Sequence, residues 1–389
     1  MDLELNNSDR PQSPLTEELT AELKAKKSSK FRKYIKNHKK GVIISTVLVV
    51  SLIAFGLGFY FLRYGKDKTT TPSLSSTNTA STAAIKTYNI LDGLAVDPSV
   101  ADRHPLAIIV ENQVDARPQS GLDKASIVYE AFAEGGITRF LALFSSLDAE
   151  KVGPVRSIRT YFVDWAHGVS AYLAHVGGNI DALDKIRAEK SYDLDQFAYS
   201  TPYWREYAAG LATEHTMYTS TSKLWQQASK NSYPTTNNFT TYKFKDDPTD
   251  ADVAALPVSQ KISINYLSSA YNVDFQYNKD SNSYRRFIAG KPQIDTISKS
   301  QISPKNLVIM TISRRAIKTR INEAGYVMIT VGSGKAQIFL DGKVIVGTWK
   351  KTSISDREIF YDEKGQEIIF NRGQFWISVI PAESSVTIQ

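Results

Sequence analysis

Cysteine is absent from this chain of 389 residues. Its absence excludes disulfides, a thiolate metal site, a cysteine nucleophile and a cysteine that carries a lipid anchor. Histidine is scarce, with 5 residues, and no two of them have the His-x-x-x-His spacing of a metal-binding helix. We therefore expect no bound metal and no cofactor, and we expect the folded part to be stabilised by packing alone.

Most of the chain carries almost no net charge, although the formal net charge of the whole chain is +7. Residues 1–68 hold 13 Lys or Arg and 7 Asp or Glu, whereas the remainder holds 34 basic and 33 acidic residues. The basic surplus therefore belongs to the N-terminal segment, and the rest of the chain has no field that would attract a polyanion. We expect no nucleic-acid partner.

One long apolar run occupies residues 41–62 and contains no charged residue. A helix of this length can cross the ~30 Å hydrocarbon core of a bilayer. Nine Lys or Arg residues lie between positions 24 and 40, so the positive-inside rule places residues 1–40 in the cytoplasm as a basic tail. Because the run is too long for a signal peptide and no clear cleavage site follows, we expect an uncleaved single-pass anchor in the cytoplasmic membrane, with the remaining chain outside.

Composition divides the rest of the chain into three parts. Residues 63–87 are rich in Ser and Thr and predict a flexible tether. Residues 88–245 predict an α/β domain, because apolar strand patterns alternate with helical patterns. A stretch rich in Asn, Thr, Asp and Pro then marks a boundary, and residues 258–389 predict a β-rich domain, either a sandwich or a barrel.

The elements of the α/β part follow from periodicity and capping residues. Apolar runs at 105–111, 127–132, 137–144 and 171–176 predict strands, with a Gly-Gly turn between the second and third. Helices are predicted at 155–167, at 180–187 behind the cap Asn179, and at 220–230. In the β-rich part, Asp341-Gly342 predicts a tight hairpin. Residues 332–334 also predict a hairpin turn, and they lack the spacing of a phosphate loop.

Charged residues gather at the predicted strand ends, where open α/β sheets tend to bind ligands. The set comprises Glu111, Glu130, Glu134, Arg139, Arg156 and Arg159. Arginine forks bind carboxylate or phosphate in a bidentate manner, so these residues form a candidate ligand site. The same residues fit a structural network that ties a helix to the sheet. His175 and His215 fit the same cleft or a purely structural role.

Catalysis by paired carboxylates is a further alternative. Glu130 and Glu134 could act as acid and base on a glycosidic bond, assisted by His175 or His215. On an extended strand, however, positions four apart are separated by ~13 Å at ~3.3 Å per residue, and the known mechanisms need ~5–9.5 Å. These two carboxylates alone are therefore a weak catalytic pair.

Several phrases of the sequence resemble the YerB-like family of bacterial envelope lipoproteins, a domain of unknown function. They lie at residues 117–121, 127–130, 133–134, 137–140, 153–159, 161–164, 332–335, 349–351, 356–357, 360–362 and 375–377. The resemblance implies a two-domain, extracytoplasmic, membrane-tethered protein of uncharacterised role. This chain departs from the family because a predicted transmembrane helix stands where those lipoproteins carry a lipidated cysteine.

Three functional hypotheses follow from these observations. The first is a membrane-anchored binding or scaffold module of the bacterial envelope, with an anionic or saccharide envelope component or a partner protein as its ligand. The second is an enzyme that hydrolyses or transfers peptidoglycan or another wall polymer. The third is an assembly protein that works through the edges of its β-rich part.

Overall fold

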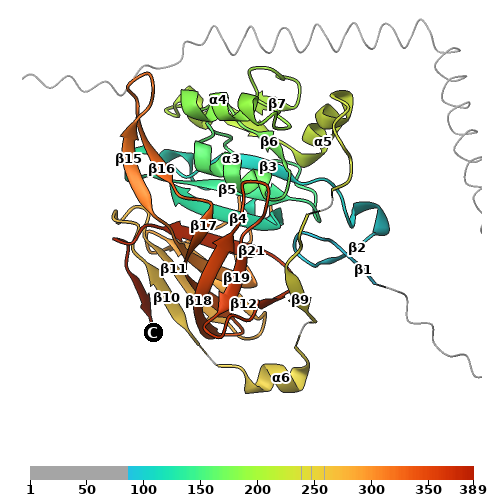
Figure 1. Cartoon of the computed structure of the whole chain (residues 1–389), viewed down its shortest axis with the longest axis vertical. Coiled ribbons are helices and arrows are strands. Elements are labelled where there is room, and N and C mark those ends of the chain that lie inside the picture. The colour runs from blue at the N-terminus through green and yellow to red at the C-terminus, as the bar shows by residue number, and fades with distance from the viewer. Residues whose placement is uncertain (1–85, 238, 247, 258) are drawn as a thin grey trace, which may run out of the picture. The chain divides into compact units, whose positions relative to one another are not determined.

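The computed structural model describes residues 86–237, 239–246, 248–257 and 259–389, which belong to one compact unit (Figure 1). The predicted basic tail, the predicted membrane span and all but the last two residues of the predicted tether lie outside these residues. Within the described residues, no helix is long and apolar enough to cross a membrane.

A nine-stranded sheet forms the centre of this unit, in the order β19-β18-β17-β14-β21-β4-β5-β3-β6. Its strand β21 runs parallel to both β14 and β4, so it joins the two halves of the sequence in one sheet. The sequence predicted two parts and did not predict this shared sheet. The strands are β3 (Leu106–Glu111), β4 (Ile127–Phe132), β5 (Thr138–Phe144), β6 (Tyr172–Ala174), β14 (Asn306–Thr311), β17 (Gly332–Leu340), β18 (Lys343–Lys351), β19 (Ile359–Asp362) and β21 (Phe375–Ile380).

A second sheet packs on one face of the first, as in a sandwich, and has the open order β13-β12-β11-β10-β22. Phe275 of the second sheet lies against Trp376 of β21, with ring centroids 6.3 Å apart. The predicted β-rich half therefore splits between the two sheets. The strands of the second sheet are β10 (Lys261–Ile264), β11 (Val273–Asn278), β12 (Ser283–Ile288), β13 (Lys291–Pro292) and β22 (Val386–Ile388).

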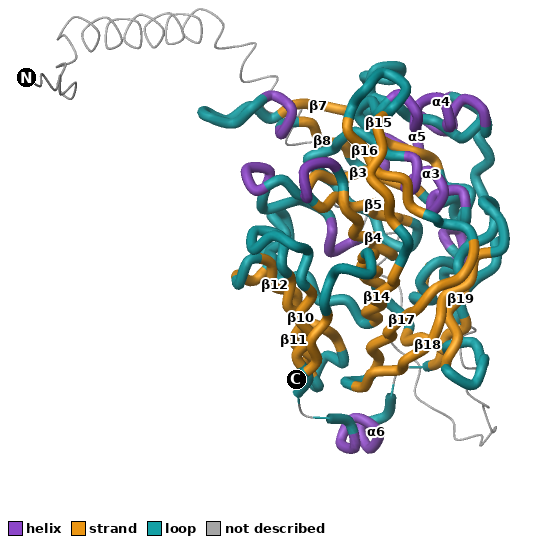
Figure 2. Tube along the Cα trace, turned by 60° about the vertical axis from the view of Figure 1, so that its left-hand side comes forward, coloured by secondary structure: helices purple, strands orange, loops and turns teal. Residues whose placement is uncertain are grey.

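Helices cover the opposite face of the nine-stranded sheet. Figure 2 shows α3 (Thr160–His167), α4 (Ile180–Ala188) and α5 (Thr221–Lys230) together at one end of the unit, with α6 (Asp250–Ala255) alone at the other. In α3, Trp165 stacks on Tyr129 of β4 at a centroid distance of 5.3 Å. The architecture is therefore three layers, with helices, a large sheet and a small sheet in that order.

Strand β4 lies in the middle of these layers, and all six of its residues are buried. Neighbouring side chains on a strand point to opposite faces, so Tyr129 points to α3 while Glu130 points to the small sheet. A strand that is covered on both faces needs a continuous apolar run. Glu130 interrupts that run and requires a partner inside the protein.

Short two-stranded pairs complete the fold. They are β1 (Thr87–Tyr88) with β2 (Ala95–Val96), β7 (Tyr203–Arg205) with β8 (Met217–Thr219), β9 (Lys243–Lys245) with β20 (Ile369–Asn371), and β15 (Arg314–Lys318) with β16 (Ala324–Met328). The β15–β16 ribbon extends to the helical end of the unit (Figure 1). There Arg320 pairs with Asp184 of α4 at 2.8 Å.

Two local predictions differ from the structure. Residues 155–159 are extended, and α3 begins only at Thr160. Gly332 to Gly334 are not a hairpin turn but the first residues of β17. A Cβ on Gly334 would lie 2.5 Å from Nε1 of Trp349, so glycine is needed there for close packing rather than for a turn.

Other local predictions are confirmed. Asn179 caps α4 by accepting from the N–H of Ala182, and the helix predicted at residues 220–230 is α5, which begins at Thr221. Asp341 and Gly342 both have positive φ, at 54° and 68°, as the predicted tight hairpin between β17 and β18 requires. Short-range signals thus located these elements correctly.

Candidate functional site

An extended segment, residues 155–159, organises the candidate site. The N–H of Arg156 donates to the carbonyl oxygen of Ile109 at 2.9 Å, and the N–H of Ile158 donates to that of Gly177 at 3.0 Å. The segment is therefore held between β3 and the loop that precedes α4. Backbone bonds of this kind fix the side chains of the segment in place.

Two adjoining cavities open along this segment and share Ser157 and Gly178 in their walls. The first, which we call the Phe197 cavity, has a volume of about 450 Å³ and a wall that includes Arg156, Val176, Phe197, Arg205, Thr213 and Glu214. The second, which we call the Arg159 cavity, has a volume of about 390 Å³ and is lined by Glu134, Ser157, Arg159, Gly178, Asn179, Glu323 and Ala324.

Arg156 joins the end of β3 to the wall of the Phe197 cavity. Its Nε donates to Oε1 of Glu111 at 2.9 Å, and its Nη2 donates to Oε1 of Glu214, also at 2.9 Å. The Nδ1 atom of His215 lies 2.8 Å from Oε2, the second carboxylate oxygen of Glu111. The buried carboxylate of Glu111 thus holds both Arg156 and His215 in place. The side chain of Arg156 also forms part of the cavity wall.

Phe197 is the most exposed large apolar side chain of the described residues, at 77%. Its ring lies against the backbone of Gly177, where an added Cβ would be 3.1 Å from the ring atom Cε2. Asp195 ties the two residues together, because its Oδ1 accepts from the N–H of Gly177 at 2.8 Å and from that of Phe197 at 3.3 Å. The ring is therefore supported on one side and open on the other.

His175 lies behind this loop and is completely buried. Its Nδ1 is 2.9 Å from the carbonyl oxygen of Gly177, and its Nε2 is 3.0 Å from Oδ1 of Asp193. The residue does not line either cavity. It holds the loop that carries Phe197.

The Arg159 cavity is built on a cluster of two arginines and one glutamate. Arg159 binds Glu134 in a bidentate manner, with Nη2 2.6 Å from Oε2 and Nε bonded to Oε1. Arg139 lies behind them, with Nη2 4.0 Å from Oε2 of Glu134 and Nη1 donating to the carbonyl oxygen of Ser157 at 2.7 Å. Burial, together with the neighbouring charge of Arg159, lowers the pKa of Arg139 to about 10.

The pKa of Glu134 is shifted as well. Burial acts to raise it, but the hydrogen bonds and charge of Arg159 and the charge of Arg139 outweigh burial, so the pKa lies below its ordinary value. The glutamate is ionised at neutral pH. One carboxylate between two guanidiniums leaves the cluster with a surplus positive charge.

Glu130 belongs to a different environment. It is completely buried and accepts from Nη2 of Arg286 at 2.7 Å, from Oγ1 of Thr138 at 2.9 Å and from Nε1 of Trp376 at 3.1 Å. This differs from the expectation that all six charged residues share one cleft. The reason is the alternation of β4, which turns Glu130 toward the small sheet.

The structure therefore sorts the predicted residues into three groups. Arg156 lines the Phe197 cavity and is bonded to Glu111, which also holds His215. Glu134 and Arg159 line the Arg159 cavity, with Arg139 behind them. Glu130 and His175 are internal. Sequence reasoning did not assign Phe197, Arg205 or Glu214 to the site. Arg205 ends the short strand β7, whereas Phe197 and Glu214 lie outside the strands and α-helices, and none of the three belongs to a recognisable motif. The Gly177-Gly178 pair was the available signal, because it marks a place where a side chain or ligand approaches the backbone closely.

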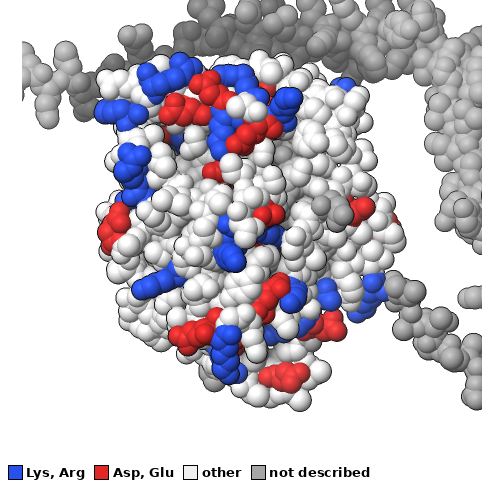
Figure 3. All heavy atoms as spheres, in the orientation of Figure 1, with Lys and Arg blue, Asp and Glu red and all other residues white. Residues whose placement is uncertain are grey.

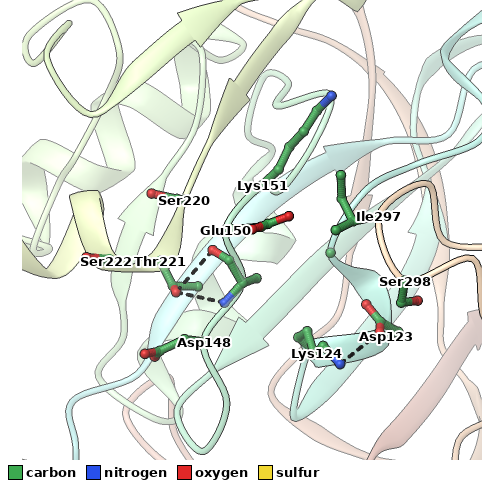
Figure 4. A pocket seen from close by; sticks show the side chains of 12 residues that line it. Asp123, Lys124, Asp148, Glu150, Lys151, Ser220, Thr221, Ser222, Ile297 and Ser298 are labelled. Atoms are coloured by element: carbon green, nitrogen blue, oxygen red, sulfur yellow. Dashed lines mark hydrogen bonds and ion pairs between the residues drawn. The ribbon is translucent and has the colours of Figure 1, made fainter.

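A third cavity, of about 660 Å³, lies between residues 121–124, residues 148–151, the start of α5 and the loop at Ile297 (Figure 4). Its two lysines already have acidic partners, since Lys151 contacts Glu206 at 2.5 Å and Lys124 contacts Asp123 at 3.2 Å. Figure 4 shows Lys151 pointing away from the other side chains. We regard this cavity as the weaker candidate for a ligand site.

A metal site has no support in the part of the chain that the structure describes, where no group of three or more His, Asp or Glu side chains is placed to hold an ion. The Arg159 cavity, with its guanidiniums, is suited to an anionic group rather than to a cation. We identify no residue set that would hold a cofactor.

The described residues form a three-layer α/β/β fold with two adjoining cavities along the segment 155–159. Two family models match the chain, the N-terminal domain of the protein of unknown function DUF3048 over residues 91–234 and its C-terminal domain over residues 262–377. The chain belongs to this family, and its resemblance to YerB is confirmed.

YerB of Bacillus subtilis illustrates the family, both by its sequence and by its crystal structure. The chain is 30% identical over 302 residues to YerB of Bacillus subtilis (strain 168), which carries the name of a candidate lipoprotein, and the match covers 77% of this chain and 87% of that protein. A crystal structure of YerB from Bacillus subtilis is similar at 28% identity with a TM-score of 0.67, and the match covers 77% of this chain and 99% of that one. The name of this relative states no ligand and no reaction.

Proposed function

We propose that this protein is a membrane-anchored, extracytoplasmic binding module of the bacterial cell envelope whose Phe197 cavity takes a saccharide component. The predicted span at residues 41–62 and the similarity to a protein named as a candidate lipoprotein support the location. The predicted span would hold the folded unit on the outer side of the cytoplasmic membrane.

The exposed ring of Phe197 carries the proposal. The ring is 77% exposed and forms part of the cavity wall, so it offers an apolar face to a ligand in the cavity. Its position at the edge of a cavity suits a flat apolar group, such as the C–H face of a sugar ring, that lies on the aromatic face.

Planar polar groups surround the ring and suit the hydroxyls of a sugar. Arg156 and Glu214 are held together at 2.9 Å, and Nη1 of Arg205 is fixed on the carbonyl oxygen of Thr213 at 2.6 Å. Donors and acceptors thus stand beside the ring without new ordering of side chains, which reduces the entropic cost of binding.

The charge distribution favours short-range recognition. Cationic and anionic side chains are intermixed on the face that Figure 3 draws. A surface of this kind produces no long-range field for a polyanion. Contacts inside the cavities must therefore select the ligand.

The enzyme alternative has less geometric support. Glu130 is enclosed by Arg286, Thr138 and Trp376, so it cannot approach a glycosidic bond. Glu134 is held by Arg159, which keeps its pKa low and unsuited to a general acid. No observation favours turnover over binding.

A titration of the full chain in detergent tests the proposal. We would follow tryptophan fluorescence and thermal stability against peptidoglycan fragments, polyprenyl phosphates and wall polymers, and assay product release in the same samples. We expect saturable binding of a saccharide fragment that falls by about tenfold or more in Phe197→Ala, since stacking contributes about 1.5 kcal/mol.

The matched control is Tyr207→Ala. Tyr207 is also exposed, at 72%, but does not line the cavity. Its removal should leave affinity unchanged. Equal losses in both variants, or no binding of any saccharide, would contradict the proposal, and product formation would replace it with the enzyme hypothesis.

A further inference from the structure

The Arg159 cavity carries more positive charge than its own residues neutralise. Arg139 and Arg159 face a single partly exposed carboxylate, that of Glu134. Glu323 also lines the cavity, but it is exposed, so water and salt screen its charge. The partly buried cations are screened far less, and the cavity is left favourable to one more negative group.

Arg139 shows this surplus most clearly. The residue is 7% exposed, and its Nε has no hydrogen-bond partner. Its guanidinium lies directly behind the cavity wall, between the carboxylate of Glu134 and the carbonyl oxygen of Ser157. A buried guanidinium with an unused donor normally has a further acceptor.

The start of α4 adds to the same field. Asn179, the cap of this helix, and Gly178 both line the cavity. The N-terminus of a helix carries about half a positive charge and exposes free backbone N–H groups. The helix end and Arg139 are independent observations, and both favour an anion at this place.

Glu134 occupies the position that such an anion would take. It lies in the turn between β4 and β5, followed by Gly135 and Gly136, which have φ of 67° and 76°. No atom lies within 4 Å of a Cβ built on either glycine, so this side of the turn is open. A short glycine turn that is open on one side deforms at little cost, and Glu134 can therefore leave Arg159.

We propose that the ligand is an acidic saccharide, and that its carboxylate or phosphate replaces Glu134 on Arg159 while its sugar ring lies on Phe197. The two cavities share Ser157 and Gly178, so one ligand can occupy both. This inference rests on the proposed function and adds the ionised substituent to it. No bond is made or broken in the exchange, and one carboxylate–guanidinium pair replaces another.

Three matched tetrasaccharides test this inference on the full chain. The first is made of N-acetylglucosamine alone, the second carries a lactyl carboxylate on alternate sugars, and the third carries phosphate at the same density. We expect the neutral sugar to bind at least tenfold more weakly than one of the acidic sugars, because tenfold corresponds to about 1.4 kcal/mol. Comparison of the second and third shows which acid the cavity prefers.

The variant Glu134→Gln gives the sharper result. It removes the competing carboxylate and nearly preserves shape, so affinity for the acidic sugar should rise about tenfold while affinity for the neutral sugar stays the same. The matched control is Glu383→Gln, which removes a carboxylate paired with Arg314 at 2.5 Å outside both cavities and should change neither affinity.

The outcomes separate this inference from the proposed function. Equal binding of neutral and acidic sugars would overturn the inference and leave saccharide binding intact. Weaker binding of the acidic sugar by Glu134→Gln would also overturn it, because Glu134 would then contact the ligand. Failure of every sugar to bind would overturn both.

Discussion

Glu130 and Glu134 lie four positions apart in the sequence, each beside arginine, and they have opposite surroundings. Glu130 is 0% exposed and meets Arg286, also 0% exposed, between the two sheets. Glu134 is 30% exposed at its side chain and meets Arg159 at the wall of a cavity. One pair is sealed between layers, whereas the other opens to solvent.

The difference arises from where each arginine comes from. Arg286 lies on β12 and is 156 positions from Glu130, so the pair forms only when the small sheet packs on the large one. Arg159 immediately precedes α3, and Glu134 follows β4, so their pair forms within one half of the sequence. The first pair joins the halves, and the second is free to serve a ligand.

Breaking the Glu130–Arg286 pair should have the largest effect on the free energy of unfolding. In Arg286→Met, Glu130 keeps the hydrogen bonds from Thr138 and Trp376 but loses its counter-charge. We expect the free energy of unfolding to fall by about 3–5 kcal/mol, as measured by denaturant titration with tryptophan fluorescence.

The matched double variant Glu130→Leu with Arg286→Met removes both charges. Replacing a buried pair by apolar side chains is often neutral or stabilising, so most of the lost stability should return. A single variant that loses less than about 1 kcal/mol, a typical value for an exposed pair, would show that Glu130 is not sealed from water.

Replacing Arg139 should have an intermediate effect on stability. Arg139 is buried like Arg286, but it belongs to the cluster with Glu134 and Arg159 at the cavity. Its Nη1 holds the carbonyl oxygen of Ser157 at 2.7 Å and so fixes the segment between the cavities. Arg139→Gln should lower the free energy of unfolding by about 1–3 kcal/mol in the same titration. A loss of unfolding free energy as large as that of Arg286→Met would show that the two clusters do not differ in their effect on stability.

Local sequence signals explain how much of the fold was predictable. The continuous apolar runs of β3, β4 and β5, the cap Asn179 and the Asp341-Gly342 turn each act within a few residues, and each prediction is confirmed. The parallel pairing of β21 with β4 was not predicted. Parallel pairing between segments some 250 positions apart leaves no mark in either strand alone.

The site was predictable only in part for the same reason. Glu111 was named because it ends a buried strand, and Arg156 because it lies in the first turn of a predicted helix, and the structure does bring them within 2.9 Å. Phe197 could not be found, because its importance depends on exposure, and a phenylalanine in a sequence is read first as a core residue. The partner of Glu130 was equally hidden, since Arg286 belongs to the other half.

The smallest effect on stability should be the pH dependence that comes from the Glu134–Arg159 pair. Arg159 and Arg139 hold the pKa of Glu134 below 4.5 despite burial, so the folded state binds a proton less readily there than the unfolded state. The stabilisation is present above the ordinary glutamate pKa and is lost as pH falls through the lowered one.

Glu134→Gln lacks this contribution at every pH. Its Tm should lie slightly below that of the unaltered protein at neutral pH, by a free energy under about 1 kcal/mol, and the gap should close between about pH 5 and pH 3. A gap that stays constant over this range would mean that the guanidiniums do not act on Glu134 in the folded protein, and the contrast between the sealed pair and the open pair would lose its electrostatic basis.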